Sequence, residues 1–93
     1  MTWKVEYAES VQKSIRKQSR QTQQWLRDYL EVRLARMRNP RQLGRAMRGT
    51  RYRKLWRYRV GDYRIIAEIN DERIRILVVR IAHRRGAYRS QIH

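Results

Sequence analysis

The stretch LWRYRVGDYR, which runs from Leu55 to Arg64, decides the fold of this 93-residue chain. Apolar or aromatic residues alternate with arginines up to Gly61-Asp62, a dipeptide that suits a two-residue hairpin turn. Residues 54–60 and 63–69 are therefore expected to form two antiparallel strands. With Gly61-Asp62 in the turn, Val60 lies opposite Tyr63 and Arg59 lies opposite Arg64.

Side-chain alternation divides this hairpin into two unlike faces. One face is almost entirely apolar and is expected to carry helices: Trp56, Tyr58, Val60, Tyr63, Ile65, Ala67 and Ile69. The other face holds Arg57, Arg59, Arg64, Ile66 and Glu68. If Asp71-Glu72 forms the next turn, a third strand over residues 74–81 adds to this second face Arg75, Leu77, Val79 and Ile81.

The residues before the hairpin change from a short strand to helical spacing. Alternation predicts a strand over residues 2–7, and apolar residues three or four apart predict helices over 8–19 and 22–38. Asn39-Pro40 ends the second helix, and residues 41–53 form a basic, glycine-containing connection. The order β-α-α-β-β-β predicts an α+β fold, with a helix pair on one face of a four-stranded, largely antiparallel sheet.

The charge of the chain indicates an anionic partner. It has 24 Lys and Arg against 8 Asp and Glu, a formal net charge of +16. This excess is self-repulsive in a compact protein, and a nucleic acid, an acidic protein or both would account for it better than a basic surface that only meets solvent. Cysteine is absent, which excludes disulfides, and neither a signal peptide nor an 18-residue apolar run is present. We expect a cytoplasmic protein that does not enter membranes.

The arginines of the second face are unusual for a strand pair. Arg59 and Arg64 lie directly opposite each other with Arg57 two positions along, and like charges placed in this way destabilise a sheet. A basic face that only meets solvent is one interpretation. The other is an anion site, in which several guanidiniums converge on phosphate groups.

A second cluster, HRRGAYR, begins at His83 and follows the last predicted strand. Arg84 has the chemistry to stabilise a charged transition state, and His83 titrates near neutral pH and can move a proton. Tyr88 can stack on a base. A purely structural histidine at a strand end, and a tyrosine that covers the sheet edge, are the alternatives.

The acidic residues are scattered without the spacing of a Mg²⁺ or Zn²⁺ site, and the chain has no P-loop. An enzyme of this kind that acts on nucleic acid is therefore expected to work without a metal or other cofactor. That expectation favours RNA, whose 2′-hydroxyl supplies an internal nucleophile and yields a 2′,3′-cyclic phosphate and a 5′-hydroxyl.

Taken together, these features resemble the RelE branch of the RelE/ParE toxin superfamily. The resemblance rests on the element order, on Asn39-Pro40-Arg41, on LWRYRVGDYR and on the HRR–YR ending, and it covers essentially the whole chain. It implies one toxin domain over residues 1–93 with a RelE-like, microbial-RNase-like fold. It also implies the toxin of a type II toxin–antitoxin system, which cleaves mRNA in the ribosomal A site and so inhibits translation.

The resemblance also assigns roles to individual residues. The implied catalytic residues are Arg64, Arg84, His83 and Tyr88. The implied RNA and phosphate contacts are Lys54, Arg57, Arg59, Arg85 and Arg89. A basic residue of the family falls on Leu55 here, so that Lys54 or Arg53 takes its place, while Ala82 and Gly86-Ala87 depart from the family pattern.

The implied partners are an acidic cognate antitoxin, the ribosome with its RNA, and mRNA. Operator DNA is expected to bind only through the antitoxin complex. Two other functions fit the same sequence: a ParE-like poison of DNA gyrase, which has a protein target, and a non-catalytic basic module that binds nucleic acid.

Overall fold

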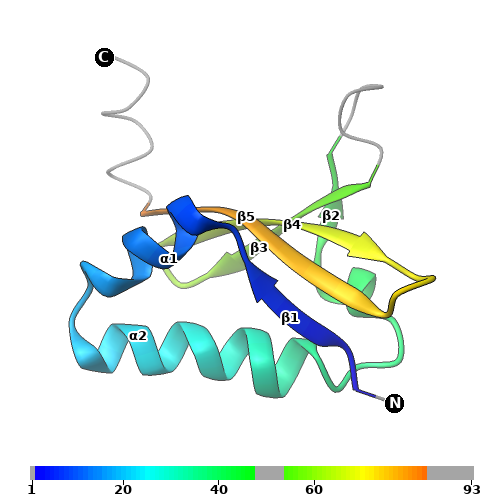
Figure 1. The fold of residues 1–93 in the computed structure, drawn as a ribbon, viewed down its shortest axis with the longest axis horizontal. Coiled ribbons are helices and arrows are strands. Elements are labelled where there is room, and N and C mark those ends of the chain that lie inside the picture. The colour runs from blue at the N-terminus through cyan, green and yellow to red at the C-terminus, as the bar shows by residue number, and fades with distance from the viewer. Residues whose placement is uncertain (1, 48–53, 84–93) are drawn as a thin grey trace.

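The computed structural model describes residues 2–47 and 54–83 of the chain (Figure 1). The strands are β1 (Lys4–Tyr7), β2 (Arg45–Ala46), β3 (Leu55–Val60), β4 (Tyr63–Asn70) and β5 (Arg75–His83). The helices are α1 (Glu9–Arg16), α2 (Arg20–Arg27), the π-helix η1 (Asp28–Leu34) and the 3₁₀ helix η2 (Pro40–Leu43).

The strands form one sheet in the order β1-β5-β4-β3-β2, and α1 and the long helix α2–η1 pack on one of its faces. β1 runs parallel to β5, and every other neighbouring pair is antiparallel. The predicted α+β class, the element order and the helix pair are confirmed. The sheet has five strands rather than four, because part of the predicted connection forms β2.

The second helix begins earlier than predicted and changes its hydrogen bonding on the way. Ser19 caps it, since its side chain accepts a hydrogen bond from the Thr22 N–H at 3.2 Å. Past Asp28 the turns widen, and the Ala35 N–H donates to the Leu30 carbonyl at 3.1 Å, five residues back. No helix in the two described ranges is long and apolar enough to cross a membrane.

The core lies between these helices and the sheet. Its buried side chains come from both layers: Val11, Ile15, Leu26, Leu30 and Leu34 from the helices, and Tyr58, Val60, Ile65, Ala67, Ile69, Ile76 and Val78 from the strands. The apolar face predicted for the hairpin is thus the face that packs against the helices. The opposite face of β3 and β4 has no helix on it in the part of the chain described (Figure 1).

The predicted register of the β3–β4 hairpin is confirmed. Val60 pairs with Tyr63 and Arg59 pairs with Arg64. Gly61 has a φ of +58°, the left-handed conformation that a tight two-residue hairpin requires and that glycine adopts without strain.

The register of β4 and β5 differs from the prediction in two ways. The turn has four residues, because Asn70 pairs with Arg75 rather than with Arg73. This shift by two positions keeps Arg75 and Leu77 on the predicted face.

A β-bulge then leaves Val79 as an extra residue, since Ala67 pairs with Val78 and Ile66 with Arg80. This shift by one position exchanges the faces beyond the bulge. Ile81 packs against the core and Arg80 takes the open face, so the predicted position of Ile81 on the arginine face is wrong.

Candidate nucleic-acid interface

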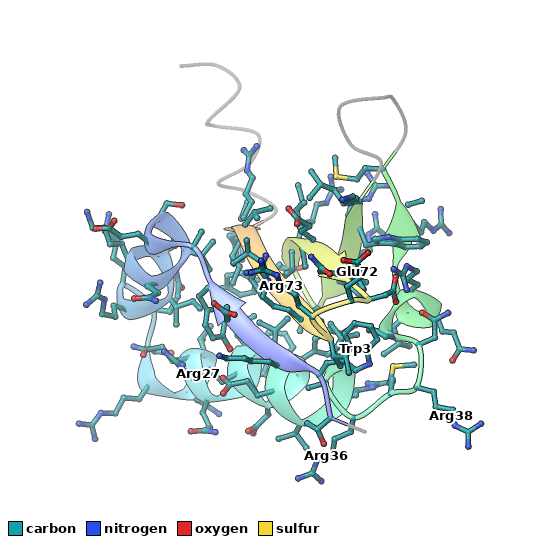
Figure 2. The ribbon with its side chains drawn as sticks, turned by 45° about the vertical axis from the view of Figure 1, so that its right-hand side comes forward. Trp3, Arg27, Arg36, Arg38, Glu72 and Arg73 are labelled. Atoms are coloured by element: carbon teal, nitrogen blue, oxygen red, sulfur yellow. The ribbon has the colours of Figure 1, made fainter. Side chains whose placement is uncertain are left out.

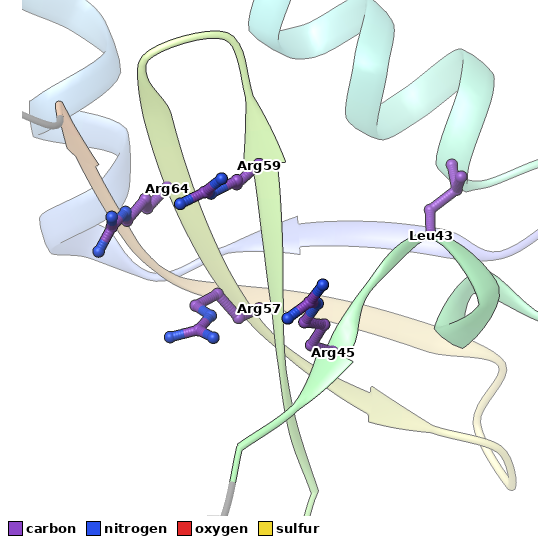
Figure 3. A pocket seen from close by; sticks show the side chains of 5 residues that line it. All are labelled: Leu43, Arg45, Arg57, Arg59 and Arg64. Atoms are coloured by element: carbon purple, nitrogen blue, oxygen red, sulfur yellow. The ribbon is translucent and has the colours of Figure 1, made fainter.

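Four arginines from three adjacent strands project from the open face of the sheet around one pocket (Figure 3). Arg45 comes from β2, Arg57 and Arg59 from β3, and Arg64 from β4. With Leu43, these residues line an open pocket of about 310 Å³, which we call the arginine pocket. The convergence predicted for Arg57, Arg59 and Arg64 is confirmed.

Arg45 joins this pocket because β2 lies close against β3. Arg45 pairs with Arg57, and the preceding Gly44 packs on the Tyr58 ring. A Cβ atom at position 44 would lie 2.7 Å from Tyr58 Cε1 and 3.1 Å from the Arg57 carbonyl oxygen. Sequence reasoning missed Arg45, since a two-residue strand shows no periodicity; Gly44 was the signal for a close backbone approach.

The Tyr58 side chain holds the neighbouring segment in place from the other side of the sheet. Its hydroxyl donates a buried hydrogen bond of 2.9 Å to the Pro40 carbonyl, at the start of η2. Burial raises the pKa of Tyr58 far above its ordinary value, so this donor keeps its proton throughout the physiological range. The hydrogen bond therefore fixes η2, and with it Leu43, at the rim of the arginine pocket.

The charges of the arginine pocket are not balanced by nearby acids. Within residues 2–47 and 54–83, no carboxylate oxygen lies within 4.0 Å of these four guanidiniums, and none of the four forms an intramolecular hydrogen bond through its side chain. Asp62 lines an adjoining pocket of about 190 Å³ together with Arg59 and Arg64. The pocket therefore gathers four guanidiniums that no carboxylate of the described residues pairs with.

The register of β4 and β5 decides which β5 side chains lie beside the pocket arginines. Arg64 pairs with Ala82, and Ile66, next to Arg57, pairs with Arg80. Glu68, the acid predicted on this face, pairs with Leu55, two residues before Arg57 along β3. The strand position beside Arg64 on β5 is thus occupied by a small alanine, while Asp62 lies at the hairpin turn on the other side of Arg59 and Arg64.

His83 does not join the arginine pocket in this structure. It pairs with Tyr63, and its ring stands edge-on to the Tyr63 ring with centroids 5.0 Å apart. The Tyr63 hydroxyl donates to Gln18 Oε1 at 2.8 Å, which places this pair on the helix face. Trp25 contacts Tyr63 in turn, at 6.2 Å between centroids. The bulge at Val79 causes this placement, because it reverses the alternation of the last residues of β5.

Lys54 also lies apart from the arginine pocket. It is exposed, directly before β3, and lines a different pocket of about 360 Å³ with Trp56, Asp71 and four further residues. Arg41 lies in the same pocket and bonds the Asp71 carboxylate, with Nη1 and Oδ1 3.1 Å apart. The hydrogen bonds from Arg41 lower the pKa of Asp71.

The other predicted site residues, Arg84, Arg85, Tyr88 and Arg89, lie outside the described residues. Among those that are described, no three side chains of His, Asp or Glu gather in a group that could hold a metal ion. Of the predicted site residues that are described, Arg57, Arg59 and Arg64 therefore line the arginine pocket, and Lys54 and His83 lie apart from it.

Comparisons with known proteins match the sequence to a family of toxins. Residues 5–88 match the family described as the ParE toxin of the type II toxin–antitoxin system, parDE. No curated protein matches the sequence.

Several crystal structures share the fold. A chain of the toxin–antitoxin complex RelBE2 from Mycobacterium tuberculosis matches with a TM-score of 0.79 and 20% identity, covering 90% of this chain and 93% of its own. The RelE–RelB complex of Pyrococcus horikoshii matches with a TM-score of 0.69 and 22% identity, covering 90% and 97%. The isolated RelE toxin of Escherichia coli matches with a TM-score of 0.68 and 18% identity, covering 97% and 95%. At these identities the likeness concerns the fold.

Proposed function

We propose that this chain, which belongs to the ParE toxin family of type II toxin–antitoxin systems within the RelE/ParE superfamily, is a ribosome-dependent mRNA endonuclease. In this proposal it enters the ribosomal A site, cleaves the message there and stops translation. A cognate antitoxin neutralises it.

The observation that carries this proposal is the arginine pocket. Four guanidiniums that no described carboxylate pairs with line an open pocket, at a site that costs the sheet stability because Arg59 and Arg64 oppose each other. The phosphodiester backbones of nucleic acids have the charge and geometry that match such a site, since each guanidinium can bond a phosphate through two parallel N–H groups.

The reaction that suits this pocket uses the RNA itself as nucleophile. The 2′-hydroxyl oxygen attacks the adjacent phosphorus, and the bond from phosphorus to the 5′ oxygen breaks. A general base takes the proton of the 2′-hydroxyl, and the leaving 5′ oxygen receives a proton. The products are a 2′,3′-cyclic phosphate and a 5′-hydroxyl, and no metal ion is required for the atoms to balance.

The position of each pocket arginine suggests its role in the proposed reaction. Arg64 is half-buried and pairs across the ladder with Arg59, so it is the guanidinium we assign to the pentacoordinate transition state. Arg57, Arg59 and Arg45 hold the scissile and neighbouring phosphates. Preorganised donors of this kind act without reorganising during the reaction, which makes them effective in catalysis.

The residues that follow β5 complete the proposed site. Arg84 is assigned to charge stabilisation, Tyr88 to stacking on the message, and Arg85 and Arg89 to phosphate contacts, as the family resemblance implies. Lys54 is proposed as a further RNA contact outside the arginine pocket. His83 is proposed as the proton donor only when RNA binding draws its ring away from Tyr63, which it contacts in this structure.

The proposed partners follow from charge. A protein of +16 is drawn to ribosomal RNA and to mRNA, and an acidic antitoxin would neutralise it. Two of the similar structures, RelBE2 of Mycobacterium tuberculosis and RelE–RelB of Pyrococcus horikoshii, are toxin–antitoxin complexes, which supports an antitoxin partner here. Operator DNA is reached through the antitoxin. The proposed compartment is the cytoplasm.

Controlled expression in a bacterial host tests the proposal. We expect cleavage of mRNA within codons of translated messages when 5′ ends are mapped, and loss of this cleavage in the Arg59→Ala/Arg64→Ala variant. The matched control is Arg38→Ala/Arg73→Ala, which removes two exposed arginines away from the pocket. Intact messages after induction of the unmodified chain would overturn the proposal, and so would equal loss in both variants.

The family match favours a second candidate function, because its description names ParE. A ParE-like chain would poison DNA gyrase and would have no need of converging phosphate ligands. A DNA-damage reporter in the same cells separates the two functions. Induction of that reporter with intact mRNA indicates gyrase poisoning, whereas cleaved mRNA with a silent reporter indicates the endonuclease.

The dependence on the ribosome has its own test. The ribosome positions the message, and orientation of this kind contributes much of the rate of a reaction that has one internal nucleophile. The purified chain is therefore expected to cleave protein-free RNA poorly. Cleavage of free RNA as fast as ribosome-bound mRNA would contradict this part of the proposal.

A further inference from the structure

The four guanidiniums of the arginine pocket are arranged in two rows rather than in one cluster. Arg59 and Arg64 face each other across the β3–β4 ladder and form the first row. Arg45 and Arg57 face each other across the β2–β3 ladder and form the second. Arg57 and Arg59 are two residues apart on β3, so the rows are separated by roughly 6.6 Å, two steps of about 3.3 Å.

Each row has the donors for one phosphate group. Two guanidiniums on directly opposite strand positions can each present two parallel N–H groups to the same phosphate. One phosphate group therefore bonds the guanidiniums of one row and leaves those of the other row without a ligand. A ligand with phosphates at both ends of a short chain satisfies both.

The pocket is also large enough to hold a small molecule. Its volume of about 310 Å³ lies at the lower end of the range of roughly 300–1,000 Å³ that is typical of such sites. Leu43, at 37% exposure, stands at its rim, and Tyr58 holds the η2 segment that carries Leu43. No acid of the described residues lies between the two rows to repel an anion.

We propose that the arginine pocket binds linear phosphoanhydrides, such as inorganic tripolyphosphate or the phosphate chain of a nucleoside triphosphate. The binding itself depends only on the pocket. Its regulatory meaning rests on the proposed function, because the same guanidiniums would hold the RNA. A phosphoanhydride would then compete with RNA, and its cellular concentration would set how much of the toxin is free to cleave.

Calorimetric titration of the purified full chain, at constant ionic strength, tests the binding. The ligands are orthophosphate, pyrophosphate, tripolyphosphate and ATP. We expect tripolyphosphate to bind at least ten times more tightly than orthophosphate, because only the longer chain reaches both rows. Equal affinity for the two ligands would overturn the proposal without recourse to any variant.

Three double variants locate the site. Arg59→Gln/Arg64→Gln removes one row and Arg45→Gln/Arg57→Gln removes the other, and each is expected to weaken tripolyphosphate binding at least tenfold. In each of these variants, tripolyphosphate is also expected to bind no more tightly than orthophosphate. Arg38→Gln/Arg73→Gln removes the same charge from exposed positions outside the pocket, labelled in Figure 2, and is expected to change affinity less than twofold. Equal losses in all three variants would show unspecific attraction and overturn the proposal.

The ATP arm identifies the source of the phosphate chain. Affinity for ATP at or above that for tripolyphosphate supports the phosphoanhydride site and identifies nucleotides as ligands. Binding of tripolyphosphate alone supports the site and identifies inorganic polyphosphate. Binding of neither overturns the inference.

Cleavage assays keep this inference separate from the proposed function. Absence of tripolyphosphate binding together with intact ribosome-dependent cleavage overturns only the inference. Tripolyphosphate binding in a chain that never cleaves mRNA overturns only the proposed function. Where both hold, added tripolyphosphate is expected to inhibit cleavage competitively, and inhibition that excess mRNA does not relieve would contradict a shared site.

Discussion

Arginine serves opposite purposes in two regions of this molecule. At the β4–β5 turn, Arg41 bonds both oxygens of the Asp71 carboxylate and lies over the Trp56 ring at 5.8 Å. In the arginine pocket, Arg59 and Arg64 face each other with no carboxylate among the described residues close enough to pair with them. The first arrangement links η2 to a turn and satisfies its own charge. The second leaves charge available for a ligand, at a cost to the sheet.

The largest expected effect comes from Arg64. Arg64→Ala removes a donor from the proposed transition state, and losses of this kind lower rates by about 100-fold or more, roughly 2.7 kcal/mol or more. Single-turnover cleavage of ribosome-bound mRNA measures the effect. Arg73→Ala, at an exposed position in the turn between β4 and β5, is the control, and a loss of similar size in that variant would remove the distinction between the two regions.

A steric change tests how β2 is held against β3. Gly44→Val places a Cβ atom 3.1 Å from a backbone oxygen and 2.7 Å from the Tyr58 ring, so the strand must shift. We expect a loss of about 1–3 kcal/mol in the free energy of unfolding, the usual range for overpacking, measured by urea denaturation. Gly44 has an extended backbone, with φ −113° and ψ 179°, so the effect is purely steric. Ala46→Val, at an exposed position of the same strand, is expected to leave stability unchanged.

Substitution of Arg45 tests whether bound RNA reaches the β2 side of the arginine pocket. Arg45→Gln is expected to weaken binding of a non-cleavable RNA by about tenfold, or roughly 1.4 kcal/mol. The slope of log affinity against log salt should also fall by about one contact. Fluorescence anisotropy over a range of salt concentrations measures both. An unchanged salt slope would mean that Arg45 does not contact phosphate.

The smallest expected effect concerns the paired region. Asp71→Asn removes the partner of Arg41, and the pair is exposed, so the change in stability should be slight. Arg41 lowers the pKa of Asp71 below its ordinary value of 3.8. A carboxylate with a lowered pKa stabilises the folded state above that ordinary value, and the contribution is lost as the pH falls through the folded-state pKa. Urea denaturation at pH 7 and pH 3 should show a larger difference between the two proteins at pH 7 than at pH 3.

The parts of the fold that were predictable from sequence depend on local patterns. Gly61-Asp62 and the alternation around it predict the register of β3 and β4, and therefore the pairing of Arg59 with Arg64. The apolar residues at helical spacing predict the helix pair. These features need no knowledge of the rest of the chain.

The features that were not predictable depend on contacts between distant segments. β2 exists because Gly44 lets it approach Tyr58, and two residues carry no periodic signal. The bulge at Val79 adds one residue to β5, and nothing in the alternation of residues 74–81 marks it. That single residue sends Ile81 to the core and His83 to Tyr63, so the predicted position of Ile81 on the arginine face failed for a reason of register.

The parallel pairing of β1 with β5 has a consequence for the order of folding. The antiparallel strands β3, β4 and β5 are neighbours in the chain, so their contacts close short loops. β1 is made first, yet its partner strand is made last of all the strands described, so Val5 and Tyr7 have no strand to pair with until then. Long-range contacts of this kind raise the relative contact order and slow folding. During synthesis, the β1 segment therefore waits unpaired, and the sheet is completed only when the two ends of the described chain meet.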